Sequence, residues 1–290
     1  MLIFLDGRFV PEEQAVVSVF DRSFLYGDGL FEMLRVFNGR PFRWRQHLKR
    51  LQHGAEFLKL KIPFQADALR GFVEQLVARN KMPDALLRLT LSRGIGVRGY
   101  SPKGAEHPTL VMSLHAAPAA PASSPSKPGA AAASRWKLIT SSIRLPAGEP
   151  LAQFKTCNKL PQILARAEAD AAGADEALLL NTEGFVVEAA SSNLFWIEGD
   201  AVCTPPLASG ILPGVTRAVI LEICDSLGIK TRESRVTSEE LKRGQSIFLS
   251  LSSWGVIEAE SLDGHVLKQS SLVETIRCAY WDLVGAETRL

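Results

Sequence analysis

The sequence predicts a two-domain protein of the α/β (α+β) class, with a small N-terminal α+β domain and a larger, barrel-like C-terminal domain. The chain has 290 residues, which is long for one hydrophobic core and fits two domains of ordinary size. Strand-like runs and helices with a 3.6-residue period recur in both halves. Between them, residues 116–134 consist of Ala, Pro, Ser, Gly and one Lys, a composition typical of a linker.

Residues 1–115 are predicted to form the N-terminal α+β domain. An Asp-Gly pair at 6–7 and an Asn-Gly pair at 38–39 separate apolar runs, so each predicts a hairpin of two short strands. Apolar side chains at helical spacing predict helices over 43–60 and 66–80. The runs ALLRLTLSRG and PTLVMSLHA then predict a further pair of strands.

Residues 135–290 are predicted to form the second domain. It opens with strands in WKLITSSIRLP, and a helix follows that begins near Leu160, because Pro161 is best tolerated in a first helical turn. DEALLLNTEGFVVEAASSNLFWIEGDAVCTPP predicts three strands, GVTRAVILEICDSLG a helix, SIFLSLSSWGVIEAESLDGHVL more strands, and SSLVETIRCAYWDLVGAE a last helix. Because strands dominate, a barrel-like or sandwich α/β domain is favoured over a doubly wound sheet.

The composition excludes several classes of function. A formal net charge of +2 gives no field that would attract nucleic acid. The four cysteines have no CxxC spacing, so we expect reduced thiols and no metal site. The N-terminal stretch has no basic region, and no apolar run reaches about 18 residues. We therefore expect a soluble, cytoplasmic protein with no membrane segment.

One glycine motif imitates a cofactor site. GIGVRG, residues 94–99, spells the dinucleotide fingerprint GxGxxG after a strand, but YSPKG follows it. The fingerprint requires a helix to open there, which Pro102 and Gly104 prevent. The sequence therefore argues against a dinucleotide site, while the same turn carries a cation and a phenol, Arg98 and Tyr100.

A candidate anion site precedes the helix in ILPGVTRAVILEI. The first-turn amides of Val215 and Thr216 and the positive end of the helix dipole favour an anion there. The alternative is that Thr216 merely caps the helix. Arg50, in a basic cluster on the first long helix, is a second candidate for the same anion, and its alternative is a solvated helix face. His47 and His53 are most simply interpreted as surface residues of that helix.

Three further charged residues attract attention. Glu188 lies on what is predicted to be a central strand, where a buried carboxylate needs a partner. It forms either an ion pair within the domain or holds a proton on a ligand. Lys155 and Lys159 lie four residues apart, but the predicted helix start separates them: Lys155 lies in an extended or turning segment, and Lys159 lies at the helix mouth. Surface exposure is the alternative for both lysines.

Together these blocks resemble a known family, the class IV aminotransferases, which are fold-type IV pyridoxal-phosphate enzymes. The resemblance covers nearly the whole chain in the family order. It rests on FDRSFLYGDGLFEMLRVFNGRPF, HLKRL, SRGIGVRGYS, FKTCNKLPQILARAEA, EALLLNTEGFVVEAASSNLFWI, ILPGVTR and SLSSWGV. It implies a small N-terminal α+β sandwich, a larger barrel-like domain that binds pyridoxal 5'-phosphate (PLP), and a homodimer.

The resemblance also assigns roles to residues. Lys155, in the K-x-x-N stretch, forms the Schiff base with the cofactor aldehyde, and Lys159 corresponds to a variable position. Glu188 faces the pyridine nitrogen and keeps it protonated. The phosphate is assigned to Arg50, Val215, Thr216, the amide of Leu251 and Ser252. Substrate contacts are assigned to Phe31, Arg98 and Tyr100.

The activity implied first is that of an aminotransferase, which moves an amino group between an amino acid and a 2-keto acid. A second reading is aminodeoxychorismate lyase, which eliminates pyruvate to give 4-aminobenzoate, because SRGIGVRGYS and SSWGV resemble that branch. A third is a catalytically silent binding protein of the same fold. The R-x-H pair of the D-amino-acid branch is replaced here by Arg98-Gly99-Tyr100, which argues against D-amino-acid specificity.

Overall fold

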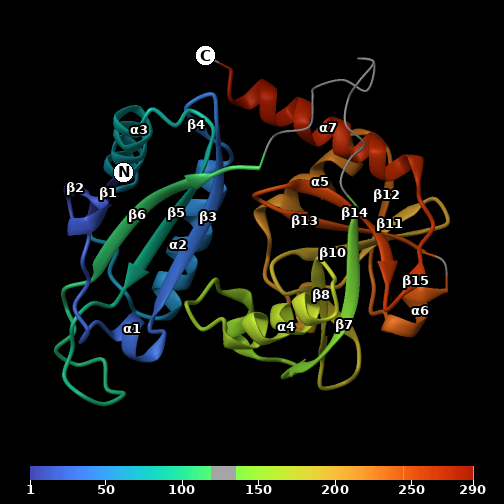
Figure 1. The fold of residues 1–290 in the computed structure, drawn as a ribbon, viewed down its shortest axis with the longest axis horizontal. Coiled ribbons are helices and arrows are strands. Elements are labelled where there is room, and N and C mark those ends of the chain that lie inside the picture. The colour runs from blue at the N-terminus through green and yellow to red at the C-terminus, as the bar shows by residue number, and fades with distance from the viewer. Residues whose placement is uncertain (119–134, 244, 290) are drawn as a thin grey trace. The chain divides into compact units, whose positions relative to one another are not determined.

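A computed structural model describes residues 1–118, 135–243 and 245–289, which form two compact units (Figure 1). Among the described residues, the first unit comprises 1–118, 154–158 and 284–289, and the second comprises 135–153, 159–243 and 245–283. Two short segments from the second half of the chain thus belong to the first unit. The expected linker lies outside the described residues from position 119 onward, so the linker and the expected domain boundaries stay predictions.

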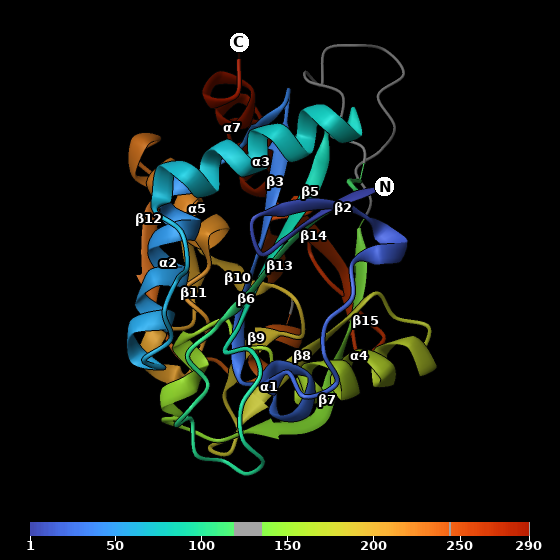
Figure 2. The ribbon, with the colours of Figure 1, turned by 90° about the vertical axis from the view of Figure 1, so that its left-hand side faces the viewer.

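The first unit contains a six-stranded antiparallel sheet in the order β2-β1-β6-β5-β3-β4 (Figure 2). Its strands are β1 (Leu2–Leu5), β2 (Arg8–Pro11), β3 (Gly29–Phe37), β4 (Arg40–Pro41), β5 (Ala85–Ser92) and β6 (Thr109–Ala116). Both expected hairpins are confirmed. Their turn residues, at 6–7 and 38–39, all have positive φ, as the favoured hairpin turn requires.

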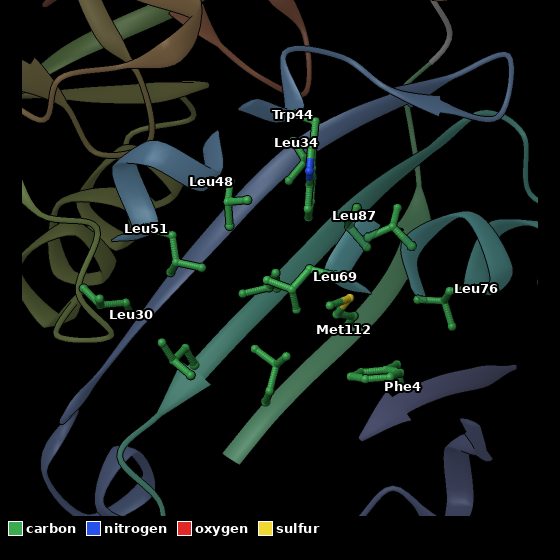
Figure 3. Close-up of a cluster of buried hydrophobic side chains, with 14 of the residues drawn as sticks. Phe4, Leu30, Leu34, Trp44, Leu48, Leu51, Leu69, Leu76, Leu87 and Met112 are labelled. Atoms are coloured by element: carbon green, nitrogen blue, oxygen red, sulfur yellow. The ribbon is translucent and has the colours of Figure 1, made fainter. Parts of the chain in front are cut away.

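Two long helices cover one face of this sheet (Figure 2). They are α2 (Trp44–Phe57) and α3 (Ala66–Asn80), and both were expected from their apolar period. Figure 3 shows the shared core, in which Leu34, Leu87 and Met112 of the strands meet side chains of the helices. A short helix, α1 (Arg22–Tyr26), and a 3-10 turn, η1 (Glu12–Gln14), were not expected.

The segment Phe154–Asn158 adds an extended stretch beside β3. The amide of Phe31 donates to the carbonyl oxygen of Lys155 at 2.9 Å, and the amide of Cys157 donates to that of Gly29 at 2.9 Å. Lys155 was expected in an extended or turning segment upstream of a helix, and this is confirmed. Its backbone is therefore held by the sheet, while its side chain stays outside any helix.

The second unit contains a nine-stranded sheet, ordered β12-β11-β10-β13-β14-β7-β8-β9, with β15 paired to β14. Its strands are β7 (Trp136–Leu145), β8 (Glu176–Asn181), β9 (Val186–Ala189), β10 (Asn193–Glu198), β11 (Ala201–Thr204), β12 (Lys230–Glu233), β13 (Ser246–Leu251), β14 (Gly255–Leu262) and β15 (His265–Val266). Residues 176–204 form four strands, so the expectation of three is wrong.

One buried cluster takes side chains from both ends of this sheet. It includes Val186 of β9 and Cys203 of β11, near the two ends of the strand order, and Leu249 of β13 between them. A sheet whose distant strands share one core must curl around it, which confirms the barrel-like form that was expected.

Four helices complete the second half of the chain: α4 (Leu160–Ala171), α5 (Val215–Ser226), α6 (Ser238–Lys242) and α7 (Ser271–Glu287), with 3-10 turns η2 (Pro150–Gln153) and η3 (Leu207–Ser209). Helix α4 starts at Leu160, with Lys159 as its N-cap and Pro161 in the first turn, as the sequence predicts. It connects the parallel strands β7 and β8 and packs Ala165 and Ala169 into a buried apolar cluster.

Candidate functional site

Strand β3 carries a buried ionic cluster on the face that packs against α2. Glu32 alternates with the core residues Leu30 and Leu34 and is held by two residues of α2. Arg50 donates through Nε to Glu32 Oε1 at 2.8 Å and through Nη2 to Oε2 at 2.6 Å. His47 Nδ1 lies 2.7 Å from the same Oε2. None of the three side chains is more than 10% exposed, so the cluster is almost dry.

The charges of this cluster follow from its burial and its pairing. Burial alone would raise the pKa of Glu32, but the charge and hydrogen bonds of Arg50 and a hydrogen bond from His47 bring it to about 2. Glu32 is therefore ionised at neutral pH. Burial lowers the pKa of His47, against the opposing influence of Glu32. Because a carboxylate only accepts hydrogen bonds, the neutral His47 donates its Nδ1 proton to Glu32.

Two interpretations of α2 are corrected by this cluster. The surface interpretation of His47 is wrong, because its side chain is 3% exposed. The solvated-face alternative for Arg50 is wrong too, since Glu32 holds its guanidinium. His53 is exposed, as expected. The helical stripe of buried residues at 44, 47, 48, 51 and 55 includes position 47, so the apolar period was the signal for its burial.

The opposite face of β3 presents Phe31 beside Lys155. The Nζ of Lys155 lies 4.7 Å from the centre of the Phe31 ring. The guanidinium carbon of Arg88 lies 4.2 Å from the same centre. Aromatic faces attract cations, so this ring holds both an amine and a guanidinium in place. Lys155 also acts on the cluster behind the strand, where its charge contributes to lowering the pKa of His47.

Arg88 is a residue that the sequence analysis missed. It lies on β5 opposite Met33, and its Nε donates to Thr90 Oγ1 at 3.2 Å. Burial lowers the pKa of Arg88, but a guanidinium stays charged in proteins. No carboxylate of the described residues lies within ion-pair distance of it. The signal that could have identified it is an arginine inside the apolar strand ALLRLTLS, because charged side chains are rarely buried there without a partner or a function.

Arg98 and Tyr100 lie in the loop that joins β5 to β6, and both are exposed, Tyr100 at 87%. No helix opens after GIGVRG in residues 94–99, so the structure agrees with the exclusion of a dinucleotide fingerprint. The two side chains belong to an exposed loop, whereas Phe31 belongs to the sheet face beside Lys155.

In the second unit, Glu188 is linked to the start of α5. Its Oε2 accepts a hydrogen bond from the amide of Leu212 at 3.0 Å, three residues before the helix. The side chain is half-buried. The expectation of a central strand is wrong, because Glu188 lies on β9, which ends the hydrogen-bonded strand order. Strand order depends on pairing between distant segments, which an apolar run does not encode.

Helix α5 begins without a capping side chain. Its N-cap is Gly214, and the buried residues Val215 and Thr216 form its first turn. Thr216 is thus not the N-cap, which corrects that alternative. A Cβ at position 214 would lie 1.9 Å from Oδ1 of Asn193, whose amide nitrogen donates to the Leu212 carbonyl at 2.9 Å. The crowding excludes any capping side chain there, and an uncapped helix start suits an anion.

Leu251 and Ser252 lie where β13 turns toward β14, and both are half-buried. The preceding Ser250 is 2% exposed, and its hydroxyl has no hydrogen-bond partner among the described residues. Ser250 is the cross-strand partner of Asn193, which holds the Leu212 carbonyl. A buried hydroxyl without a partner costs about 1–3 kcal/mol, so its presence here favours a site that receives a polar ligand.

Each unit therefore collects part of the expected residue set. The first brings Phe31, Arg50 and Lys155 to neighbouring positions around β3. The second connects Glu188 through Leu212 to the start of α5. Within the described parts of the chain, no group of three or more His, Cys, Asp or Glu residues is placed to hold a metal ion. No helix in those parts is long and apolar enough to cross a membrane.

Comparisons with known proteins agree over nearly the whole chain. A Methanocaldococcus jannaschii protein with the provisional name branched-chain-amino-acid aminotransferase is 34% identical over 275 residues, covering 94% of this chain and 92% of the relative. The structure of a branched-chain aminotransferase from the archaeon Thermoproteus uzoniensis, with norvaline, has a TM-score of 0.89 at 28% identity, covering 99% of this chain and 95% of that one.

A lyase structure matches as well. The 4-amino-4-deoxychorismate lyase from Pseudomonas aeruginosa has a TM-score of 0.81 at 33% identity, covering 99% of both chains. The model of the family described as amino-transferase class IV matches residues 29–262. A family match over most of the chain, with relatives of this identity and coverage, confirms the resemblance inferred from the motifs. The chain belongs to the class IV aminotransferase family.

Proposed function

We propose that this member of the family is a PLP-dependent aminotransferase in which Lys155 is the catalytic lysine. The observation that carries the proposal is the setting of Lys155. Its backbone is held against β3, and its amine contacts the Phe31 ring, which also contacts the guanidinium of Arg88. A reactive amine that shares a ring with a cation lacking a carboxylate partner suits a substrate that brings a carboxylate with it.

The chain's polar groups fit the three functional ends of the cofactor. PLP supplies an electron sink for a carbanion at the substrate Cα. Lys155 offers a primary amine for the aldehyde, and Glu188 offers a carboxylate to hold a proton on the pyridine nitrogen. The phosphate would be held by the α5 amides of Val215 and Thr216, the Leu251 amide, the Ser252 hydroxyl and the Arg50 guanidinium. A solved branched-chain amino acid aminotransferase of the same fold that holds pyridoxamine 5'-phosphate supports this assignment.

The roles of the chain's own groups follow from their chemistry. Lys155 Nζ would take the proton from the Cα of the amino donor, and in the second half of the cycle it would deliver a proton to the Cα of the acceptor. Arg88 would bind a substrate carboxylate, and the Phe31 ring would provide an apolar wall beside it. Glu32 holds Nε and Nη2 of Arg50, so a phosphate at this guanidinium would share it with that carboxylate.

Two matched lysine variants test the catalytic assignment. Borohydride should fix PLP covalently to the wild type and to Lys159→Ala, and peptide mapping should place the label on Lys155. Lys155→Ala should bind PLP without this label and should lose transamination activity. Because the two lysines lie four residues apart, Lys159→Ala controls for the loss of a local positive charge. A label on any other lysine, or full activity in Lys155→Ala, would contradict the assignment.

The names of the relatives suggest the first substrates. We propose a branched-chain amino acid as donor, supported by the M. jannaschii relative and the T. uzoniensis structure. We propose 2-oxoglutarate as acceptor, supported by a solved branched-chain aminotransferase complexed with N-(5'-phosphopyridoxyl)-L-glutamate. Arg88 adds to this support, because a dicarboxylic acceptor has a second carboxylate for a cation to bind. Spectral conversion of the bound cofactor to its amine form by leucine, valine or isoleucine, in single turnover, would support this choice.

Aminodeoxychorismate lyase is the second candidate, and the P. aeruginosa structure at 33% identity favours it. A single turnover with aminodeoxychorismate and no keto acid separates the two reactions. Release of pyruvate and 4-aminobenzoate means lyase. Cofactor conversion by ordinary amino acids, without pyruvate release from aminodeoxychorismate, means aminotransferase. A purified protein that takes up no PLP would refute both and favour a binding protein of the same fold.

A homodimer is also proposed, supported by an apolar surface on the first unit. Phe20, Phe24 and Val97 are 65%, 73% and 68% exposed. A β-bridge between Asp21 and Ile95 places the two exposed segments side by side. Contiguous apolar surface of this kind marks an interaction site. Phe24→Glu should shift the mass measured by light scattering toward a monomer, whereas Val266→Glu, at a separate exposed position on β15, should not.

We also propose a cytoplasmic location, supported by four cysteines that form no disulfide.

A further inference from the structure

Helix α1 clamps the loop that joins β5 to β6. The buried Arg22 donates through Nη1 to the carbonyl oxygens of Gly99 at 2.9 Å and Ser101 at 3.1 Å. Its Nη2 donates to the carbonyl oxygen of Tyr100 at 3.1 Å. The hydroxyl of Tyr26 accepts from the amide of Gly99 at 3.2 Å. Two side chains of α1 thus fix three consecutive residues of an otherwise exposed loop.

The loop is shaped to admit this clamp. At Gly96, a Cβ would lie 2.9 Å from Cδ of Arg22 and 3.0 Å from Cβ of Ala105. A side chain there would displace the stem of Arg22, because both contacts are closer than ordinary van der Waals distance. The glycine pattern that imitates a dinucleotide fingerprint therefore has another use here. Its second glycine leaves room for the arginine.

Asp28 ties the clamp to the sheet. Its Oδ2 accepts from Nε of Arg22 and from Nε of Arg93, both at 2.8 Å. Burial opposes ionisation of Asp28, but the hydrogen bonds and charges of Arg93 and Arg22 outweigh it and lower its pKa. Arg93 uses its other nitrogens to hold the carbonyl oxygens of Leu58 and Lys59 at the end of α2. One carboxylate therefore orients two arginines that hold different segments.

The same turn meets the end of the Lys155 segment. Gly29, next to Asp28, accepts from the amide of Cys157 at 2.9 Å. On the other side of Asp28, the carbonyl of Gly27 accepts from Nδ2 of Asn158 at 3.5 Å. Residues 27–29 thus fix the segment that follows Lys155 through their backbone, and fix the clamp through the Asp28 side chain.

We propose that Arg22 is a positioning residue that holds the loop in the shape in which Arg98 and Tyr100 meet the substrate. The proposal rests on the proposed function and on the substrate contacts that the family resemblance assigns to those two residues. Arg22 lies outside the set assigned to the cofactor and to the reacting atoms. Its loss should therefore weaken substrate binding and leave the chemical step intact.

Loop opening is measured first, in the holoenzyme and independently of activity. Trypsin cleaves after Arg98, which the clamp protects by fixing the next three residues. Arg22→Met should raise the rate of this cleavage at least about tenfold, because cleavage tracks the population of the open loop. Arg22→Lys keeps a charge for Asp28 but lacks the fork that spans three carbonyls, so it should give a smaller rise.

Arg93→Met is the matched control, because it removes the other arginine from the same carboxylate. It should increase cleavage after Lys59, at the end of α2, and leave cleavage after Arg98 unchanged. Steady-state kinetics form the second measurement. Arg22→Met should raise KM for the amino donor about tenfold with kcat within about twofold, the pattern of lost binding rather than lost chemistry.

Several outcomes would overturn the proposal. One is a cleavage rate after Arg98 that is unchanged in Arg22→Met, and another is an equal rise in Arg93→Met. A fall in kcat at constant KM would do the same. If Arg22→Met does not fold, Arg22→Lys decides by the same measurements. A wild type without transaminase or lyase activity would refute the proposed function, and the cleavage rates would still decide whether the clamp exists.

Discussion

Two arginines lie over opposite faces of the first unit's sheet, Arg50 on helix α2 and Arg88 on strand β5, and their positive charges have different surroundings. Arg50 faces the core, where Glu32 holds its guanidinium in two hydrogen bonds. Arg88 lies on the other face of the sheet, against Phe31, with no carboxylate of the described residues within ion-pair distance. Both are partly or largely removed from water. The first charge is neutralised by a carboxylate of the fold, and the second has no such partner among the described residues.

The difference separates a cation that the fold itself pairs from one that it leaves without a carboxylate. A buried pair such as Arg50 and Glu32 fixes geometry, and removing one partner leaves an uncompensated buried charge. A half-buried cation without a carboxylate partner is destabilising in the folded state, which favours a role in binding an anion. Loss of Glu32 should therefore change stability through its pair with Arg50, the residue also proposed to hold the cofactor phosphate, whereas loss of Arg88 should change substrate affinity.

The largest effect is expected from breaking the buried pair. Glu32→Gln leaves Arg50 buried without a counter-charge, so the free energy of unfolding should fall by about 3–5 kcal/mol. Urea denaturation at pH 7 measures it. Arg88→Gln, which breaks no ion pair, should change the same quantity by less than about 1 kcal/mol. Equal losses in the two variants would remove the distinction between the arginines.

Low pH should reduce the difference in unfolding free energy between the wild type and Glu32→Gln. The pKa of Glu32 is lowered from 4.5 to about 2 in the folded state, so its ionised form stabilises the fold above pH 4.5, and this is lost as pH falls through 2. The shift corresponds to about 3 kcal/mol. The difference in unfolding free energy between wild type and Glu32→Gln should be constant from pH 7 to 5 and shrink below pH 4.5. A difference that stays constant to pH 2 would contradict the pKa.

Removing the second cation should affect affinity. Arg88→Gln should raise KM for a dicarboxylic acceptor about 10- to 100-fold, since a hydrogen bond to a charged group contributes about 1.5–3 kcal/mol. Steady-state kinetics measure it. Lys49→Gln removes an exposed positive charge from α2 and serves as the control, with no change in KM expected. An unchanged KM in Arg88→Gln would refute the carboxylate-binding role.

The smallest effect concerns His47. Its pKa is lowered by burial, so below about pH 6.5 the unfolded chain takes up a proton that the folded chain does not. The wild type should therefore lose about 1 kcal/mol of unfolding free energy per pH unit as pH falls below that value. His47→Gln should lose this dependence, while the other histidines contribute equally to both proteins. Parallel slopes between pH 7.5 and 5.5 would show that His47 protonates normally.

Local patterns predicted the elements well where the signal is local. Pro161 marked the start of α4, and the Asp-Gly and Asn-Gly pairs marked both hairpins. Strand β12 was not predicted, because all four of its residues are exposed and its sequence has no apolar alternation. Helix α1 was not predicted, because five residues are too few to show a helical period.

The sequence names candidate site residues, but it does not predict what surrounds them in the folded chain. Family motifs singled out Lys155 and Glu188, but the edge position of Glu188 depends on strand pairing across the unit. The surface interpretation of His47, and the solvated-face alternative for Arg50, follow from the usual exposure of polar side chains. Their burial depends on Glu32, which lies on another element and becomes their partner only in the folded chain. A pattern along the sequence does not show which charged residues of different elements will pair in the folded chain.

The attachment of Lys155 to β3 has a kinetic consequence. Two backbone hydrogen bonds, at 2.9 Å each, fix the chain directly after its Cα, through the Lys155 carbonyl oxygen and the Cys157 amide, so its amine moves mainly by rotation about side-chain bonds. Rotamer changes of exposed or half-exposed side chains take about picoseconds to nanoseconds, whereas enzymes typically turn over about 1 to 1,000 times per second. Side-chain motion of the Lys155 amine is therefore far too fast to limit the rate of turnover in the proposed reaction.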